Sequence, residues 1–356
     1  MDQITPKPVK QFKVIGTRPL RPDGIEKVTG KAIYGADLCA PNMLYGLMLR
    51  INEPHALIES IDVSIAEKLP GVKSIITFKD FIKINPDNKY NETLENCIAN
   101  EKVLYDGHAV AAVAAVDLNT AKKAIKSINV KFKKLPFVIN IEDAMKKEAP
   151  LVAKGKKNEN IPDGFSDNVV QYCSFGHGNL EQGFNESDKV IKRTFKTPSV
   201  HQGYIEPHAC LASMSDDGKA DLWCCTQGHY NVRSICSNIF KIDNSQLKVT
   251  ASEIGGGFGG KTTVFIEPIA LALSQKSGRP VKIVMSREEV FKATGPTVSS
   301  LVDVKIGMKK NGKISAAEAI IRYEGGAFPN ETYELGAQSA FAAYDLKSVK
   351  TEAYNV

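Results

Sequence analysis

The sequence predicts an α+β protein built from two successive units. Short apolar or alternating runs that fit strands are interspersed with runs at helical spacing. This pattern occurs on both sides of the stretch 146–168, which is polar, contains Pro and Gly and lacks periodicity, as is typical of a linker. The length of 356 residues, of which 43% are hydrophobic, allows two or three domains that each bury a core.

The elements of the first unit follow from local patterns. The run 64–69 predicts a short helix that Ser64 can cap. The apolar run 108–116 precedes a helix over 117–128. Three further runs are expected to form strands: 43–51, 72–78 and 129–135.

The second unit repeats the mixture of helices and strands. A helix over 179–188 can be capped by Asn179, and a helix over 229–240 has its apolar residues on one face. Another helix is expected to begin near Pro268 and to end at about Ser277. Strands are expected at 189–197, 220–226, 281–286, 301–308 and 314–324.

The composition indicates a cytoplasmic protein and excludes several classes. The net charge of +6 is spread among acidic residues without an aromatic-interleaved basic stripe, so nucleic-acid binding is not expected. No run of about 18 apolar residues predicts a membrane span, and the N-terminus lacks the apolar core of a signal peptide. The seven cysteines include no C-x-x-C pair, which argues against a disulfide scaffold, a zinc ribbon and an iron–sulfur cluster held by this chain.

A glycine-rich stretch, 255–262, matches G-x-x-x-x-G-K-T, the phosphate loop of nucleotide hydrolases. In that motif the next helix begins inside the pattern, so that its amides face the phosphates. Here such a helix would carry Pro268 in its third turn at a cost of about 3 kcal/mol. The following strand also ends without the Asp that helps hold magnesium. Spacing alone leaves a nucleotide site, a cradle for another anion and a glycine turn without a ligand open.

Several segments together resemble the molybdenum-binding subunit of the xanthine dehydrogenase and aldehyde oxidase family. The resemblance covers residues 16–356, and the order and spacing of the segments make it specific. The segments that carry it are "GTRPLRPDGIEKVTGKAIYGADL" (16–38), 50–77, 103–136, "HQGYIEPHACLA" (201–212), 226–240, "IGGGFGGK" (254–261) and 277–289.

The resemblance implies a fold, a reaction and a set of partners. The reaction is hydroxylation of a substrate carbon with water as the oxygen source, on a molybdenum–molybdopterin cofactor for which the cytosine dinucleotide form is one option. Electrons leave through [2Fe–2S] clusters and FAD on partner chains. The implied domains are an N-terminal arm (1–15), an a/b hammerhead domain (16–145), a linker (146–175) and the first lobe of the molybdopterin-binding domain (176–356).

The resemblance also assigns residues to the active site. Gln227 matches the family glutamine that hydrogen-bonds an oxygen ligand of molybdenum, although spacing alone also fits a helix cap or turn residue. The segment Gly257, Phe258, Gly259 and Gly260 matches the loop whose backbone approaches the metal and the pterin dithiolene. Glycine suits that approach because a Cβ would block it, whereas Phe258 could equally belong to the core. No direct protein ligand to the metal is expected.

Other candidates carry weaker interpretations. His201 and His208 flank Glu206, and this spacing favours buried hydrogen-bonded structure over a metal site. Lys261 is the phosphate lysine of a nucleotide site, or else a surface or backbone-bonding lysine.

A first departure from the family concerns the substrate. Xanthine-specific enzymes carry Glu at the position of Thr262 and Arg at that of Thr297, so xanthine is not expected. Aldehydes, other N-heterocycles, aryl-CoA thioesters and carbon monoxide stay open. Phe341 aligns with an aromatic that stacks on flat substrates.

A second departure concerns the end of the sequence. In the family the last strand continues into a lobe with most pterin contacts and the glutamate base, which neither Glu324 nor Glu334 matches. We therefore expect no turnover by this chain alone, and either a second molybdopterin-domain chain completes the site or the sequence is a fragment. Two rival hypotheses stay open: a nucleotide hydrolase using Gly255–Thr262, and a truncated scaffold without catalysis.

Overall fold

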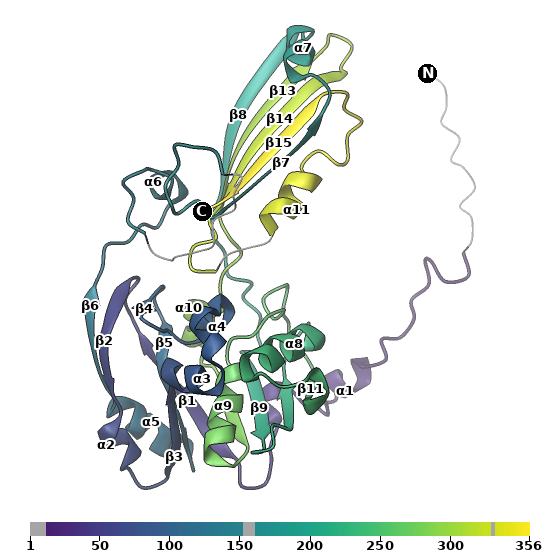
Figure 1. The fold of residues 1–356 in the computed structure, drawn as a ribbon. Helices are drawn as coiled ribbons and strands as arrows, with labels where there is room; N and C mark the ends of the chain where they lie inside the picture. The colour runs from purple at the N-terminus through teal and green to yellow at the C-terminus, as the bar shows by residue number, and fades with distance from the viewer. Residues whose placement is uncertain (1–11, 152–160, 329–331) are drawn as a thin grey trace.

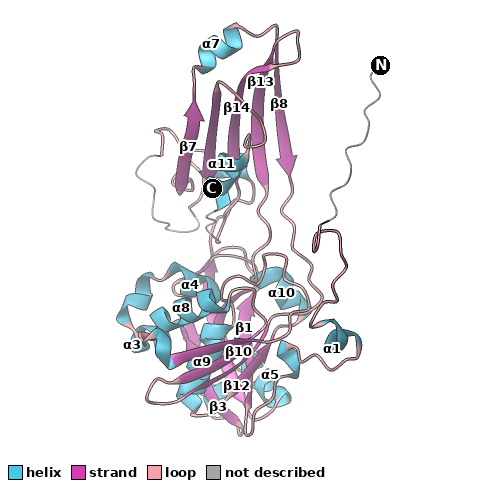
Figure 2. Ribbon diagram, turned by 90° about the vertical axis from the view of Figure 1, so that its right-hand side faces the viewer, coloured by secondary structure: helices cyan, strands magenta, loops and turns pink. Residues whose placement is uncertain are grey.

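The computed structural model describes residues 12–151, 161–328 and 332–356, which form two lobes joined at a narrow waist (Figure 1). Each lobe combines strands and helices, which confirms the predicted α+β class (Figure 2). The upper lobe in Figure 1 is a sheet with a helix against it, and the lower lobe is a sheet with helices on both faces.

The core of the lower lobe is a mixed seven-stranded sheet in the order β11-β10-β9-β12-β1-β5-β3. Parallel pairing of β1 with β12 places Leu44 beside Val281. Strands from both sides of the predicted linker therefore belong to one sheet and share its core. The strands are β1 (Leu44–Ile51), β3 (Val72–Thr77), β5 (His108–Ala115), β9 (Ala209–Met214), β10 (Ala220–Cys224), β11 (Leu247–Ala251) and β12 (Val281–Val284).

Helices cover both faces of this sheet. Every residue of β5 is buried, because alternate side chains enter different clusters. Ala112 packs on the side of α9, and Val113 packs on the side of α5. The helices are α2 (Ser64–Glu67) and α5 (Leu118–Lys126) on one face, α3 (Phe78–Ile84), α4 (Glu92–Cys97), α8 (His229–Phe240) and α9 (Glu267–Ser277) on the other, and α10 (Arg287–Ala293) after β12.

The upper lobe is a five-stranded sheet in the order β7-β15-β14-β13-β8. Helix α11 (Thr332–Ser339) packs on β7, β14 and β15, and α7 (Leu180–Asn185) contacts β13 and β14. Strand β7 begins inside the predicted linker 146–175, because residues 171–177 pair along their whole length with β15. The strands are β7 (Gln171–His177), β8 (Lys189–Thr197), β13 (Ser300–Met308), β14 (Ile314–Tyr323) and β15 (Val349–Asn355).

Smaller elements flank the two sheets. A three-stranded sheet in the order β4-β2-β6 packs against β1 and β5 within the lower lobe. No helix in the described part of the chain is long and apolar enough to cross a bilayer. The remaining elements are α1 (Gly24–Val28), η1 (Gly35–Asp37), β2 (Ala56–Asp62), η2 (Pro86–Tyr90), β4 (Lys102–Val103), β6 (Asn129–Lys134), α6 (Ile141–Ala144) and η3 (Asn244–Gln246).

Local predictions of helices agree well with the structure. Helix α8 has the predicted bounds, Asn179 caps α7 with its side chain, and α9 begins one residue before Pro268. The predicted capping role of Ser64 is wrong, because Val63 is the N-cap of α2. The backbone amide of Ser64 instead donates to the carboxylate of Asp62 at 3.0 Å. Asp62 is within reach because it is the last residue of β2, two positions before Ser64.

Candidate functional site

The glycine loop, residues 255–261, lies where two neighbouring strands end. Strands β10 and β11 are parallel, so their carboxyl ends meet at one edge of the sheet. Gln227 follows β10 and precedes α8, while the glycine loop follows β11 and precedes α9. In sheets of this kind, the edge beyond the carboxyl ends of parallel strands is where ligands commonly bind.

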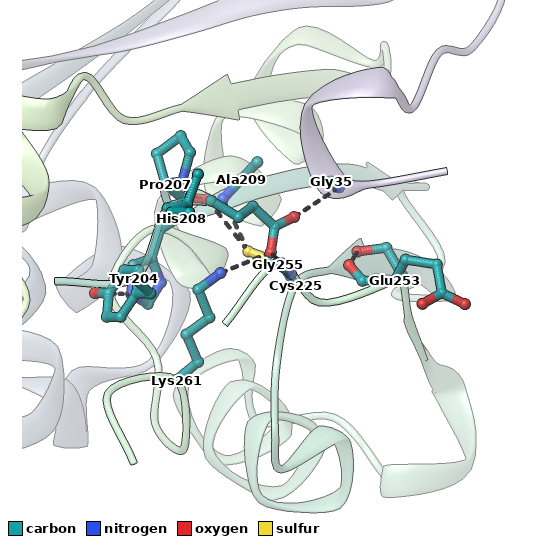
Figure 3. A network of polar contacts seen from close by, with 12 residues as sticks. Gly35, Tyr204, Pro207, His208, Ala209, Cys225, Glu253, Gly255 and Lys261 are labelled. Carbon is teal, nitrogen blue, oxygen red and sulfur yellow. Dashed lines mark hydrogen bonds and ion pairs between the residues drawn. The ribbon is translucent and has the colours of Figure 1, made fainter. Parts of the chain in front are cut away.

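Lys261, at the end of this loop, is fully buried. Its Nζ lies 2.7 Å from Oε2 of Glu206 and stands over the ring of Tyr204. The same carboxylate accepts hydrogen bonds from the amides of Gly255 at 2.8 Å and Gly35 at 3.2 Å (Figure 3). The prediction of a surface or backbone-bonding side chain for Lys261 is therefore wrong, because a buried ammonium requires a paired carboxylate.

This geometry argues against the phosphate-loop hypothesis. Helix α9 begins at Glu267, so the loop amides are not the N-terminal amides of a helix. The Lys261 ammonium is held by Glu206 and is not directed toward a ligand. Both features that make a phosphate loop bind phosphate are thus missing here.

The side chain of Gln227 closes the glycine loop. Its Oε1 accepts hydrogen bonds from the amides of Gly259 at 3.1 Å and Lys261 at 3.2 Å. Two N–H donors identify this atom as the amide oxygen and leave Nε2 as the free donor group. Nε2 has no hydrogen-bond partner among the described residues, and the residue is exposed. The alternative of a helix cap is wrong, because α8 has no side-chain cap.

The glycines of the loop serve two different purposes. A Cβ on Gly257 would lie 2.4 Å from Oε1 of Gln227, and one on Gly260 would lie 2.8 Å from the ring of Tyr204. These two positions face the protein and require glycine for packing. At Gly259 a Cβ would meet nothing within 4 Å, although its φ of +85° also favours glycine.

Phe258 lies in the same loop with a φ of +51° and is 75% exposed. The alternative of a core residue is therefore wrong, because the left-handed backbone turns this side chain outward. Phe258 and Gly259 are the part of the loop that faces open space.

A cavity of about 530 Å³ adjoins the loop. Thr262 lines it beside Gly259 and Gly260. Thr297 does not, because its backbone pairs with Val200 at the entrance to the upper sheet. Its two neighbours in the sequence line the cavity instead.

Phe341 is not brought to this cavity. It follows α11 and lines a separate depression with Phe175 and His177 on the five-stranded sheet. It packs there with the cluster that joins α11 to β7 and β15. The interpretation of Phe341 as a substrate-stacking residue is therefore not supported by its position, because α11 holds it against the upper sheet.

The histidines near the loop are structural. Nε2 of His208 lies 2.8 Å from the hydroxyl of Tyr204, and burial lowers the pKa of His208 to about 3. Nε2 of His201 lies 2.9 Å from Oγ1 of Thr294. In the described part of the chain, no group of three or more His, Cys, Asp or Glu side chains could hold a metal ion. The buried His208 agrees with the interpretation as buried hydrogen-bonded structure, whereas His201 is hydrogen-bonded but only partly buried.

Sequence reasoning missed two parts of the site. The first is the role of Glu206 as the common acceptor for Gly35, Gly255 and Lys261. The second is Gln202, which lines the cavity and has a buried Oε1 without a hydrogen-bond partner among the residues that the structure describes. Glu206 carries no local signal of this role, because its partners lie at least 49 positions away in the sequence.

Comparisons with protein families identify the class of protein to which this fold and glycine loop belong. The family described as "Molybdopterin cofactor-binding domain" matches residues 161–356. The family described as "Aldehyde oxidase and xanthine dehydrogenase, a/b hammerhead domain" matches residues 29–136. The chain therefore belongs to the molybdenum-binding subunits of the xanthine dehydrogenase and aldehyde oxidase family, with a hammerhead domain followed by a molybdopterin-binding domain.

Individual relatives agree with this assignment. The chain is 32% identical over 346 residues to a probable xanthine dehydrogenase subunit of Bacillus subtilis, covering 95% of this chain and 44% of that protein. It is 27% identical to the nicotinate dehydrogenase large molybdopterin subunit of Eubacterium barkeri, covering 90% and 72%. The crystal structure of a Cu,Mo-CO dehydrogenase superposes with a TM-score of 0.83 at 27% identity, covering 96% of this chain and 44% of that one. The chain thus spans about half the length of most of these proteins.

Proposed function

We propose that this chain forms one wall of the active site of a molybdenum hydroxylase that oxidises an aldehyde or an N-heterocyclic aromatic substrate. When bound, the molybdenum–molybdopterin cofactor supplies the oxidative hydroxylation, with water as the oxygen source. The residues present fit such a group. Gln227 presents an Nε2 donor without a hydrogen-bond partner among the described residues, and Gly259 leaves open space beside the loop backbone.

The orientation of the Gln227 amide is the observation that carries the proposal. The loop amides fix its oxygen inward, so its NH₂ group points away from them. A neutral donor held in advance can stabilise negative charge on an oxygen of the cofactor without adding charge of its own. Gln227 is therefore the binding and orienting residue that this chain contributes.

The lining of the cavity supports a neutral substrate. Among its described lining residues the only charged side chain is Glu324, which accepts a hydrogen bond from Ser299. No lysine or arginine of the described chain lines it to hold a purine oxygen or a CoA phosphate. An aldehyde or a neutral N-heterocycle fits this lining better than xanthine or an aryl-CoA thioester.

The proposal includes partners and a compartment. Electrons leave to [2Fe–2S] and FAD partner chains, and the rest of the site comes from a second molybdopterin-domain chain or from further length of the protein. The 356 residues alone are then inactive. We place the assembly in the cytoplasm, because all seven cysteines are free thiols.

Co-expression tests the proposal. The chain would be produced together with the proposed partners, a [2Fe–2S] chain, an FAD chain and a second molybdopterin chain, and the purified complex analysed for metal and pterin. We expect about one molybdenum per copy, and mass spectrometry of the released cofactor identifies the cytosine dinucleotide form if it is present. A stable complex without metal or pterin would support the scaffold hypothesis instead.

A further inference from the structure

We propose that the buried ion pair between Glu206 and Lys261 is a positioning device that sets the glycine loop and, through it, the amide of Gln227. The pair is almost inaccessible, with side-chain exposures of 8% for Glu206 and 0% for Lys261. The significance of this role for catalysis rests on the proposed function, whereas the geometry of the pair does not.

Glu206 holds the beginning of the loop. Its carboxylate accepts from the Gly255 amide at 2.8 Å, and a Cβ on Gly255 would lie 2.6 Å from the Cβ of Glu206. The loop backbone is therefore in direct contact with this side chain, and only glycine permits that approach. Figure 3 shows Gly35, Gly255 and Lys261 converging on the same carboxylate.

Lys261 connects this carboxylate to Gln227. Its ammonium pairs with Glu206, while its backbone amide donates to Oε1 of Gln227 at 3.2 Å. Its backbone carbonyl accepts hydrogen bonds from the backbone amide of Gln227 at 2.8 Å and from Oγ1 of Thr226 at 3.1 Å. A single residue thus links the carboxylate that holds the start of the loop to the side chain that closes its end.

An N-terminal segment supports the same carboxylate from outside. Gly35 donates to Glu206, and the amide of Glu253 donates to the carbonyl of Ile33 at 3.1 Å. Lys27 forms an ion pair with Glu253, two residues before the loop. The loop is therefore held on both sides by charged groups from segments that are distant in the sequence.

A buried ion pair of this kind is a poor source of stability. Desolvation of two charges offsets most of their attraction, so neutral side chains of similar shape can replace such a pair without loss of stability. Removing only one partner leaves an uncompensated charge and destabilises the fold. A role in geometry therefore predicts that the neutral double variant recovers stability without recovering loop order.

The test uses the full chain in four forms: the parent, Glu206→Gln, Lys261→Met and the double variant Glu206→Gln/Lys261→Met. The matched control is Asp303→Asn/Arg322→Met. It neutralises a partly buried ion pair in the upper sheet, in which a guanidinium nitrogen lies 2.8 Å from a carboxylate oxygen. Thermal unfolding reports stability, and amide hydrogen exchange reports the order of the Gly255, Gly259 and Lys261 amides. The amides of β5, which carries none of the substituted residues, serve as an internal reference.

We expect both single variants to lose thermal stability and the double variant to recover most of it. In the double variant the loop amides should exchange at least about tenfold faster than in the parent, while the amides of β5 do not change. The control pair should leave loop exchange unaltered. A folded double variant with parent-like loop protection overturns the proposal, as does a parent in which these loop amides are unprotected.

A second measurement on the assembled complex separates this proposal from the proposed function. If the complex contains molybdenum, the double variant should retain several-fold less of it and show an altered Mo(V) electron paramagnetic resonance signal. Unchanged metal content and an unchanged signal would overturn the role toward the cofactor. If the parent complex contains no molybdenum, the proposed function fails, and hydrogen exchange still decides whether the pair positions the loop.

Discussion

At the scale of single residues, the Gln227 amide has two separable tasks. Its oxygen accepts from two loop amides, and its nitrogen has no partner among the described residues. A substitution that removes both atoms therefore mixes a structural effect with a functional one. A carboxylate at the same position keeps an oxygen for the loop, but it replaces the donor with an acceptor that carries negative charge.

We predict different results for Gln227→Ala and Gln227→Glu. The alanine variant should lose about 1–2 kcal/mol of unfolding free energy, because two loop amides lose their acceptor. The glutamate variant should unfold nearly like the parent. Both should slow turnover of the assembled complex by about 10²-fold, as expected for loss of a charge-stabilising donor. Parent-like turnover of Gln227→Glu would exclude a donor role.

Gly259 offers a test of close approach by the cofactor. Gly259→Val should keep the fold, because a Cβ meets nothing within 4 Å, but should lose cofactor because the side chain occupies the open space. The left-handed backbone adds a strain of about 1–2 kcal/mol. The matched control is Gly312→Val, which has a φ of +81° and equally free surroundings in the β13–β14 turn. Both variants should lose similar stability, whereas full molybdenum retention by Gly259→Val would contradict the close approach.

His108 predicts a pH dependence of stability. Its Nδ1 accepts from the Leu104 amide at 3.1 Å, and Nε2 lies 2.7 Å from the carbonyl of Glu95, so the neutral ring is bound. Burial lowers the pKa of His108 to about 3. The unfolded chain takes up a proton near pH 6.5 and the folded chain does not, so the unfolding free energy falls as the pH decreases through this window.

The expected slope for His108 is about 1.4 kcal/mol per pH unit between about pH 6 and the folded pKa. His208 adds a similar contribution, because burial also lowers its pKa to about 3. Urea unfolding at pH 7 and pH 5 measures the difference. His108→Gln should be less stable than the parent at pH 7. Its unfolding free energy should also depend less steeply on pH, by about the 1.4 kcal/mol per pH unit that His108 contributes. An unchanged dependence would mean that the His108 ring is protonated in the folded chain.

At the scale of secondary-structure elements, the sequence predicted what local patterns control. The helix over 229–240 has the predicted bounds because its apolar residues share one face, and Pro268 marks the start of α9 because proline suits a first turn. The pairing of β1 with β12 could not be predicted, since nothing in residues 44–51 indicates a partner more than 200 positions away.

The same limit applies to the candidate site. The resemblance to the family selected Gln227 and the glycine loop, and the structure brings them together. The buried pairing of Lys261 was missed, because a lysine after glycines carries no local sign of a distant carboxylate. Phe341 was assigned to the site by alignment, but the packing of α11 against the upper sheet holds it elsewhere.

At the scale of the whole molecule, the two matched regions share one core. Strand β1 lies between β12 and β5, so the first region completes the sheet of the second. The main cluster combines Leu44, Ile76 and Phe81 from before the linker with Ile269 and Leu273 from after it. The two regions are therefore expected to depend on each other for folding.

We predict that residues 161–356 expressed alone do not reach a cooperative folded state. Without β1, the backbone edge of β12 and the buried Val281 and Ile283 become exposed, and α9 loses its contacts with β3 and β5. Circular dichroism should show partial secondary structure without a sharp thermal transition. Co-expression with residues 12–151 as a separate chain should restore a soluble pair, because the shared sheet supplies the missing contacts. A piece 161–356 that unfolds cooperatively at the temperature of the whole chain would show that the second region folds independently.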